Sequence, residues 1–182
     1  MFCTRGFFSS IIVRPCCQLC SDWRFRLTLL AASEMGEKSK VPYVARAFLP
    51  PALWETVREF AHLSGRSIFD QQRFLFEAGC NASRRLENFR PLSERDWGPN
   101  PEVRDDRFRT KFAFSKQDRS LLVERQVTEE VRYTVQVREA IAVAVEAALT
   151  LPEPERYAAK KETIADIIVR RYRYRYRHIR AS

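Results

Sequence analysis

Hydrophobic and polar residues alternate most regularly over residues 107–114, which read Arg-Phe-Arg-Thr-Lys-Phe-Ala-Phe. A period of two is typical of a β-strand with one buried face and one solvent-exposed face. The buried face is expected to carry Thr110 and three phenylalanines, Phe108, Phe112 and Phe114. The exposed face is expected to carry three cations, Arg107, Arg109 and Lys111.

Helical periodicity follows this strand. Ser115 and Asp118 have the spacing of a capping box, with Asp in place of Glu, and predict a helix that runs to about Glu130. A further helix is expected over about residues 134–150, because apolar residues recur there at spacings of three and four. The turn between the two contains no glycine, so residues 118–149 are also compatible with one long helix.

Residues 43–79 have the same order of elements. An extended segment over residues 43–49, in which Arg46 is the one outward cation, precedes two prolines that are compatible with a first helical turn. A helical apolar stripe follows and is expected to stop at Gly65. Ser67 is expected to cap a second helix that runs to about residue 79 or slightly beyond.

Composition divides the chain into segments. Residues 35–80 and 107–150 form two strand–helix–helix segments, joined by a polar, proline-containing connector at 81–106. Residues 151–182 form a C-terminal helix, expected from near Glu155, and a basic tail. This organisation predicts a mainly α-helical protein with one or two short β-strands.

Residues 1–34 differ from the rest in being rich in arginine and cysteine and poor in acid. They are compatible with an organelle transit peptide, with a metal site, or with an unstructured extension ahead of a true start at Met35. A structural zinc site usually has two spaced ligand pairs, and the cluster Cys16, Cys17 and Cys20 lacks the second pair. We therefore favour the extension and expect no metal. The cysteines form no spaced framework, so a reducing, cytoplasmic compartment is expected.

The 182-residue chain is basic, with a formal net charge of +9. Hydrophobic residues make up 45% of it, which is enough for a packed core. Positive charge gathers at the C-terminus, where no acidic residue follows Asp166. Such a concentration attracts phosphate backbones or anionic lipid. No run of 18 or more apolar residues occurs, so no membrane-spanning helix is expected.

Arginine and tyrosine alternate through the tail, and both a strand and a helix would separate the charges from the aromatic rings. Arginine neutralises phosphates, and tyrosine stacks on unpaired bases, so nucleic acid is the expected partner. The alternatives are tyrosines that pack on the protein body beside solvated arginines, or a helix that lies on a membrane surface. The predicted nucleic-acid-binding residues here are Arg170, Arg171, Tyr172, Arg173, Tyr174, Arg175, Tyr176 and Arg177.

The strand–helix–helix order with a basic outer strand face resembles the ribbon-helix-helix family of DNA-binding proteins, over residues 107–150 and also over 43–79. The resemblance implies an antiparallel two-stranded ribbon that enters the major groove. A homodimer would form it, or one chain would pair segment 43–49 with segment 108–114. The resemblance also implies base or backbone contacts from Arg107, Arg109 and Lys111, and a phosphate contact from Thr134. The turn before Thr134 departs from the small residue, often glycine, that the family carries there.

The sequence thus predicts a nucleic-acid-binding protein, with DNA favoured over RNA, that acts as a regulator or accessory factor of bacterial or mobile-element type. No phosphate loop, zinc-protease or kinase motif appears, so neither an enzyme nor a cofactor is expected. One alternative is an RNA-associated or scaffold protein that uses the basic tail. Another is a helical protein–protein adaptor, in which the Arg/Phe alternation is a charged edge strand that resists aggregation.

Overall fold

The computed structural model describes residues 43–86, 91–99 and 105–180, and of residues 175–180 it describes the backbone only. The described chain is mainly helical with a small two-stranded antiparallel sheet, which confirms the expected fold class. The expected N-terminal extension and its cysteines lie outside the described residues. The elements, in chain order, are β1 (Tyr43–Ala45), α2 (Pro51–Leu63), α3 (Ile68–Arg85), the 3-10 turn η2 (Asp106–Phe108), β2 (Phe112–Phe114), α4 (Lys116–Thr128), α5 (Tyr133–Leu149), α6 (Glu155–Ala158) and α7 (Lys161–Arg180).

The two predicted strands exist and pair with one another. β1 and β2 are antiparallel, with Tyr43 opposite Phe114. The same register continues to a bridge between Phe48 and Arg109, beyond the ends of both strands. The pairing therefore extends along both predicted segments, and we call this two-stranded structure the ribbon.

The inner face of the ribbon faces the core, as the alternation predicts. Phe112 is buried and packs against Phe76 of α3, with 5.2 Å between the ring centroids. Thr110 is fully buried, and its hydroxyl accepts a hydrogen bond from the amide of Ala47 (2.7 Å) and donates one to the Ala47 carbonyl (3.1 Å). A side chain thus helps the backbone to fix the register, which decides which residues face outward.

The helices begin at the predicted caps. At the start of α3, the Ser67 hydroxyl accepts a hydrogen bond from the amide of Asp70 (3.1 Å). At the start of α4, Ser115 and Asp118 form a full capping box. The chain then turns before α5 begins at Tyr133, so residues 118–149 form two helices and the alternative of one long helix is excluded.

The strand–helix–helix unit occurs twice with a constant spacing. β1, α2 and α3 form the first repeat, and β2, α4 and α5 form the second repeat. Helices α2 and α4 have 13 residues each and begin at Pro51 and at Lys116, which are 65 residues apart. Helices α3 and α5 begin at Ile68 and at Tyr133, which are again 65 residues apart.

Contacts across the ribbon obey the same spacing. Arg119 of α4 donates a hydrogen bond to the hydroxyl of Tyr43 (2.6 Å), and Trp54 of α2 meets the ring of Phe108 edge-on, with 6.3 Å between centroids. Trp54 and Arg119 are equivalent positions in the two repeats, and so are Tyr43 and Phe108. Exchanging the repeats also leaves the ribbon register unchanged. The repeats are therefore related by an approximate twofold axis through the centre of the ribbon, which we call the pseudo-dyad.

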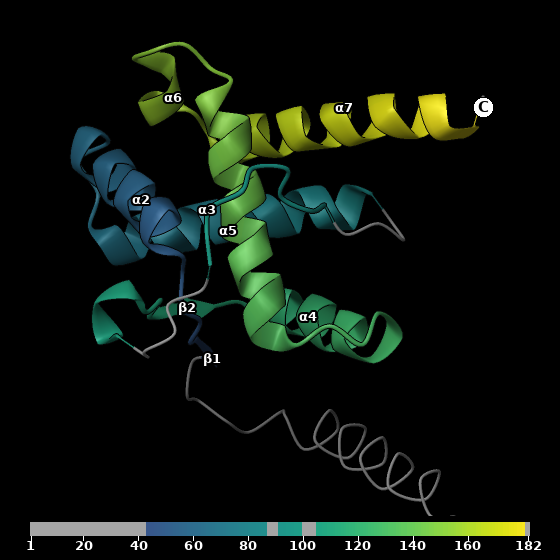
Figure 1. Cartoon of the computed structure of the whole chain (residues 1–182), viewed down its shortest axis with the longest axis horizontal. Helices are drawn as coiled ribbons and strands as arrows, with labels where there is room; N and C mark the ends of the chain where they lie inside the picture. The colour runs from purple at the N-terminus through teal and green to yellow at the C-terminus, as the bar shows by residue number, and fades with distance from the viewer. Residues whose placement is uncertain (1–42, 87–90, 100–104, 181–182) are drawn as a thin grey trace, which may run out of the picture. The chain divides into compact units, whose positions relative to one another are not determined.

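Helices α3 and α5 cross in the middle of the fold (Figure 1). A Cβ atom on Gly79 of α3 would lie 2.4 Å from the carbonyl oxygen of Ala140 in α5, so glycine permits the close approach of the two backbones. Residues 141–148 of α5 are all buried, and Ile164 and Ile168 of α7 are buried as well. The core is thus formed by α3, α5 and α7, with α2, α4 and the ribbon packed around it.

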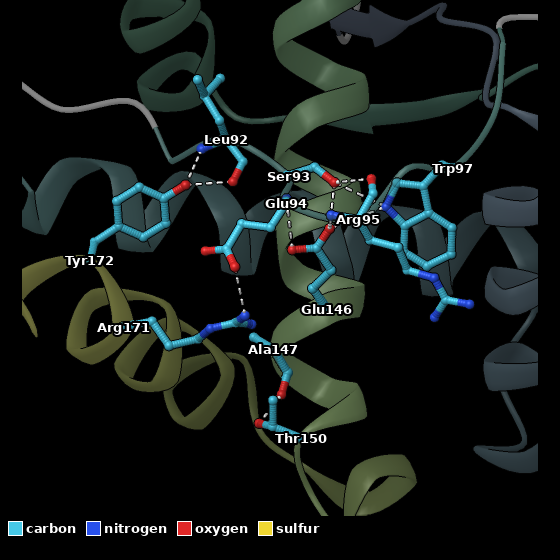
Figure 2. A network of polar contacts seen from close by, with 10 residues as sticks. All are labelled: Leu92, Ser93, Glu94, Arg95, Trp97, Glu146, Ala147, Thr150, Arg171 and Tyr172. Carbon is cyan, nitrogen blue, oxygen red and sulfur yellow. Dashed lines mark hydrogen bonds and ion pairs between the residues drawn. The ribbon is translucent and has the colours of Figure 1, made fainter. Parts of the chain in front are cut away.

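The connector between the repeats is shorter than predicted, because α3 continues to Arg85 rather than stopping near residue 79. Residues 91–99 of the connector run beside α5, and the carboxylate of Glu146 accepts hydrogen bonds from their backbone and side chains (Figure 2). Its donors are the amides of Glu94 (3.2 Å) and Arg95 (2.9 Å), the indole of Trp97 (3.3 Å) and the hydroxyl of Ser93. A carboxylate with this many donors holds the connector in place.

The predicted C-terminal helix is divided into the short α6 and the long α7. Arginine and tyrosine residues of the tail continue α7 as a helix, so the extended alternative for residues 170–177 is wrong. The Tyr172 side chain is buried, and its hydroxyl bonds to both backbone groups of Leu92 (Figure 2). The beginning of the tail is therefore attached to the connector.

Candidate nucleic-acid interface

The outer face of the ribbon presents three successive pairs of side chains. The register places each pair directly across the two strands, at the positions between the hydrogen-bonded pairs, where opposed side chains lie closest. Four of the six side chains are exposed and two are partly buried. The pairs are Val44 with Ala113, Arg46 with Lys111, and Phe48 with Arg109.

Two cations face each other at the centre of the ribbon. Arg46 and Lys111 are equivalent positions, 65 residues apart, and the register sets them opposite each other on the pseudo-dyad. Among the described residues, neither has an ion-pair partner. Like charges directly opposite in a sheet destabilise it. A polyanion on this face would remove that repulsion.

Arg109 lies at one end of the outer face, as the alternation predicts. Its guanidinium is 3.1 Å from the carboxylate of Asp106, whose side chain is 81% exposed. An ion pair this exposed contributes only about 0–1 kcal/mol. The side chain can therefore exchange Asp106 for another acceptor at little cost.

Arg107 does not lie on the outer face of the ribbon, so the prediction that it projects from the strand is wrong. It belongs to η2, where the chain makes a 3-10 turn instead of an extended strand. Its backbone amide (2.9 Å) and its Nε (2.8 Å) both donate to the carboxylate of Asp105, and these bonds hold the pKa of Asp105 below its usual value. Asp105 caps the turn, which is why the local structure overrides the strand pattern here.

Thr134 is exposed and occupies the second position of α5, close to the predicted start of that helix. Helix α5 begins without a side-chain cap and without an acidic residue in its first turn. By contrast, α3 begins with a Ser67 cap and with Asp70 in its first turn. Unpaired amides at a helix N-terminus favour an anion, so α5 is the better suited of the two to a phosphate.

The tail residues divide into two sets. Tyr172 is buried against the connector, and Arg171 pairs with Glu94 (3.3 Å), so both contribute to the fold. Arg170 and Arg173 are exposed, and Tyr174 is 68% exposed. Predicted residues that fall where side chains are not described are Arg175, Tyr176 and Arg177.

The ribbon and the tail are not brought together. Figure 1 places β1 and β2 on one side of α3 and the end of α7 on the other. The outward cations of the ribbon and the exposed residues of α7 therefore form two separate surfaces.

Sequence reasoning identified Arg46 as an outward residue but did not include it among the site residues. The signal that would have found it is the spacing of 65 residues between Arg46 and Lys111. The same spacing relates Gln71 and Gln136, which are both buried. Few other identities occur at this spacing, so the order of elements reveals the repeat but the residue-by-residue equivalence is hard to recognise from sequence.

Other candidate chemistry is limited in the described part of the chain. Burial raises the pKa of the Cys80 thiol, so the reactive thiolate is disfavoured there. Within residues 43–86, 91–99 and 105–180, no group of three or more His, Cys, Asp or Glu residues is placed to hold a metal ion. The predicted cysteine cluster at 16–20 lies outside the described residues. None of the described helices is long and apolar enough to cross a bilayer.

Comparison with known proteins adds no relative. A scan against protein-family models gave no match, and searches of curated proteins and of solved structures gave none either.

Proposed function

We propose that this chain binds double-stranded DNA and inserts the outer face of its ribbon into the major groove. The observation that carries the proposal is the pair of opposed cations, Arg46 and Lys111, at the centre of a two-stranded ribbon. The ribbon lies on the pseudo-dyad of two strand–helix–helix repeats. This arrangement is the one that the resemblance to the ribbon-helix-helix family implies for a single chain with two copies.

The dimensions of nucleic acids favour DNA over RNA for this surface. The major groove of B-form DNA is about 12 Å wide and admits a two-stranded β-ribbon. The major groove of A-form RNA is deep and narrow, and side chains do not reach its bases. A rigid ribbon with exposed Arg and Lys side chains is therefore suited to base edges in DNA, where these residues pair with guanine.

The core supports the ribbon from behind. Thr110 and Phe112 fix its register and its inner face, so the outward direction of Arg46 and Lys111 does not depend on binding. A pre-ordered surface loses less entropy on association than a flexible one. A protein that occupies a DNA site in this way acts as a regulator or as an accessory factor.

The test removes the two central cations and compares the resulting loss of DNA affinity with the loss caused by removing two cations outside the ribbon. Arg46→Ala with Lys111→Ala is expected to weaken binding to a duplex selected by the wild-type protein by about 30-fold or more, because two base contacts of about 1–3 kcal/mol each are lost. Affinity is measured by fluorescence anisotropy at fixed salt concentration.

The matched control is Arg58→Ala with Lys160→Ala, which removes one Arg and one Lys from exposed positions outside the ribbon. Its affinity is expected to stay within about threefold of wild type, since it loses only non-specific attraction. Equal affinities for the two double variants would overturn the proposal, because the ribbon would then act only through net charge.

A further inference from the structure

The two ends of the ribbon differ in chemistry. One end presents Val44 and Ala113, which are small and apolar, and the other presents Phe48 and Arg109. The pseudo-dyad makes Val44 equivalent to Arg109, and Phe48 equivalent to Ala113, because each pair is 65 residues apart. Two identical strands would give two identical ends, so the divergence of the repeats gives the ribbon a direction.

Hydrogen bonding within the ribbon is directional as well. Thr110 bonds through its hydroxyl to the backbone of Ala47, on the side of the ribbon near Arg109. The equivalent position in the first repeat is Ala45, which has no hydroxyl to make the same bonds. The two ends of the ribbon are therefore held differently: the regular ladder of β1 and β2 lies at the Val44–Ala113 end, and the Thr110 hydroxyl supports the isolated bridge at the Phe48–Arg109 end.

We propose that the ribbon reads a non-palindromic DNA sequence in one fixed orientation, with a single chain on each site. The inference rests on the proposed function and adds the kind of sequence recognised. The Val44–Ala113 end lies against thymine methyl groups, and the central cations and Arg109 lie against guanine edges. Apolar side chains are complementary to the thymine methyl group, and Arg and Lys are complementary to the two acceptors of guanine.

One chain is sufficient because both strands of the ribbon come from it. A ribbon made by two copies of one strand presents a symmetric face and requires a symmetric site. Here both strands are covalently joined, so the order of side chains from Val44 to Arg109 along the groove is the same in every molecule.

The experiment selects duplexes from a randomised double-stranded DNA pool with the full-length chain. The wild-type protein is expected to select a non-palindromic sequence, to bind it with one chain per duplex, and to prefer it about tenfold or more over each of the two palindromic duplexes made by duplicating one half of the site. Stoichiometry is measured by titration at a duplex concentration well above Kd.

Val44→Arg restores the same residue type at the two equivalent positions. The selected sequence is expected to become more symmetric, with guanine at both ends. Arg109→Val places valine at both of these equivalent positions and is expected to remove the guanine preference at the Phe48–Arg109 end. Val127→Arg is the control, because it makes the same substitution at an exposed valine of α4 outside the ribbon, and its selected sequence is expected to match that of the wild type.

The outcomes separate this inference from the proposed function. A palindromic site that binds two chains, or unchanged selection by both Val44→Arg and Arg109→Val, would overturn the fixed orientation while DNA binding by the ribbon stands. Failure of the wild-type chain to enrich any duplex would overturn both.

Discussion

Gly65 and Glu130 occupy the same backbone position in the two repeats, in the turn that joins the helices. Both have positive φ angles, 64° for Gly65 and 55° for Glu130. Glycine adopts this left-handed region freely, whereas a residue with a Cβ atom is destabilised by about 1–2 kcal/mol. The turn conformation is therefore a property of the repeat and not of the residue. The turn at 130–133, which lacks the glycine that is common in the family, therefore tolerates Glu130 as local strain.

Opposite effects on stability follow for the two positions. Glu130→Gly is expected to raise the free energy of unfolding by about 0.5–1 kcal/mol, because relief of strain exceeds the added freedom of the unfolded chain. Gly65→Ala is expected to lower it by about 1 kcal/mol, although a Cβ atom there meets nothing within 4 Å, because the φ angle alone causes the strain. Urea unfolding measures both. A loss of stability in both variants would show that Glu130 does not hold this conformation in solution.

At the scale of elements, local sequence patterns predicted the strands and the helix starts better than the contacts between elements. The alternation over 107–114 identified the second strand, and the serine–aspartate pairs located the starts of α3 and α4. Each of these signals lies within a few residues of sequence, so it can be recognised from the sequence alone. The pairing of the two strands within one chain was one of the two alternatives that the family resemblance implied, the other being a homodimer, and the structure shows the first.

Changes at buried positions hid which residues of the two repeats are equivalent. Helix α2 buries Leu53, Val57 and Phe60, while the equivalent positions of α4 are Asp118, Leu122 and Arg125. The charged residues are accommodated because Asp118 pairs with Arg84, and Arg125 donates to the hydroxyl of Ser83 (3.3 Å). Such partners lie more than thirty residues away in sequence, so no local pattern indicates that these positions are buried.

The connector is an element whose structure depends on one buried carboxylate. In Glu146→Gln, only one side-chain oxygen remains as an acceptor. The new amide group then faces either the backbone N–H of Glu94, or the donors to the other carboxylate oxygen, which include the backbone N–H of Arg95. Unpaired donors and the loss of charge-assisted hydrogen bonds are expected to lower the free energy of unfolding by about 2–3 kcal/mol.

Urea unfolding measures this loss, and hydrogen exchange at the amides of residues 93–97 shows whether it arises in the connector. Glu155→Gln is the control, because Glu155 is exposed, and it is expected to change stability by less than about 0.5 kcal/mol. If the two variants were equally stable, the connector would not depend on Glu146.

At the scale of the whole molecule, two basic surfaces have different chemistry. Thr110 holds the ribbon in register and Phe112 packs it on the core, so its outward side chains are suited to discriminate between bases. The exposed part of α7 presents Arg170 and Arg173 on a helix that packs on α3 and is attached to the connector by Tyr172. Nothing in that arrangement orders the arginines against base edges, and Figure 1 places the end of α7 on the other side of α3 from the ribbon. We therefore expect the tail to contribute affinity for phosphates and the ribbon to contribute specificity.

Salt dependence distinguishes these roles. Arg170→Ala with Arg173→Ala is expected to make the slope of log K against log salt concentration shallower by about 1–2, since each lost phosphate contact releases about one fewer counterion. The duplex selected from a random pool should remain that of the wild type. Deleting the tail is a poorer test, because it also removes the bonds of Tyr172 to the connector and so changes the fold. If the double substitution altered the selected sequence, α7 would read bases itself and the division between specificity and affinity would be wrong.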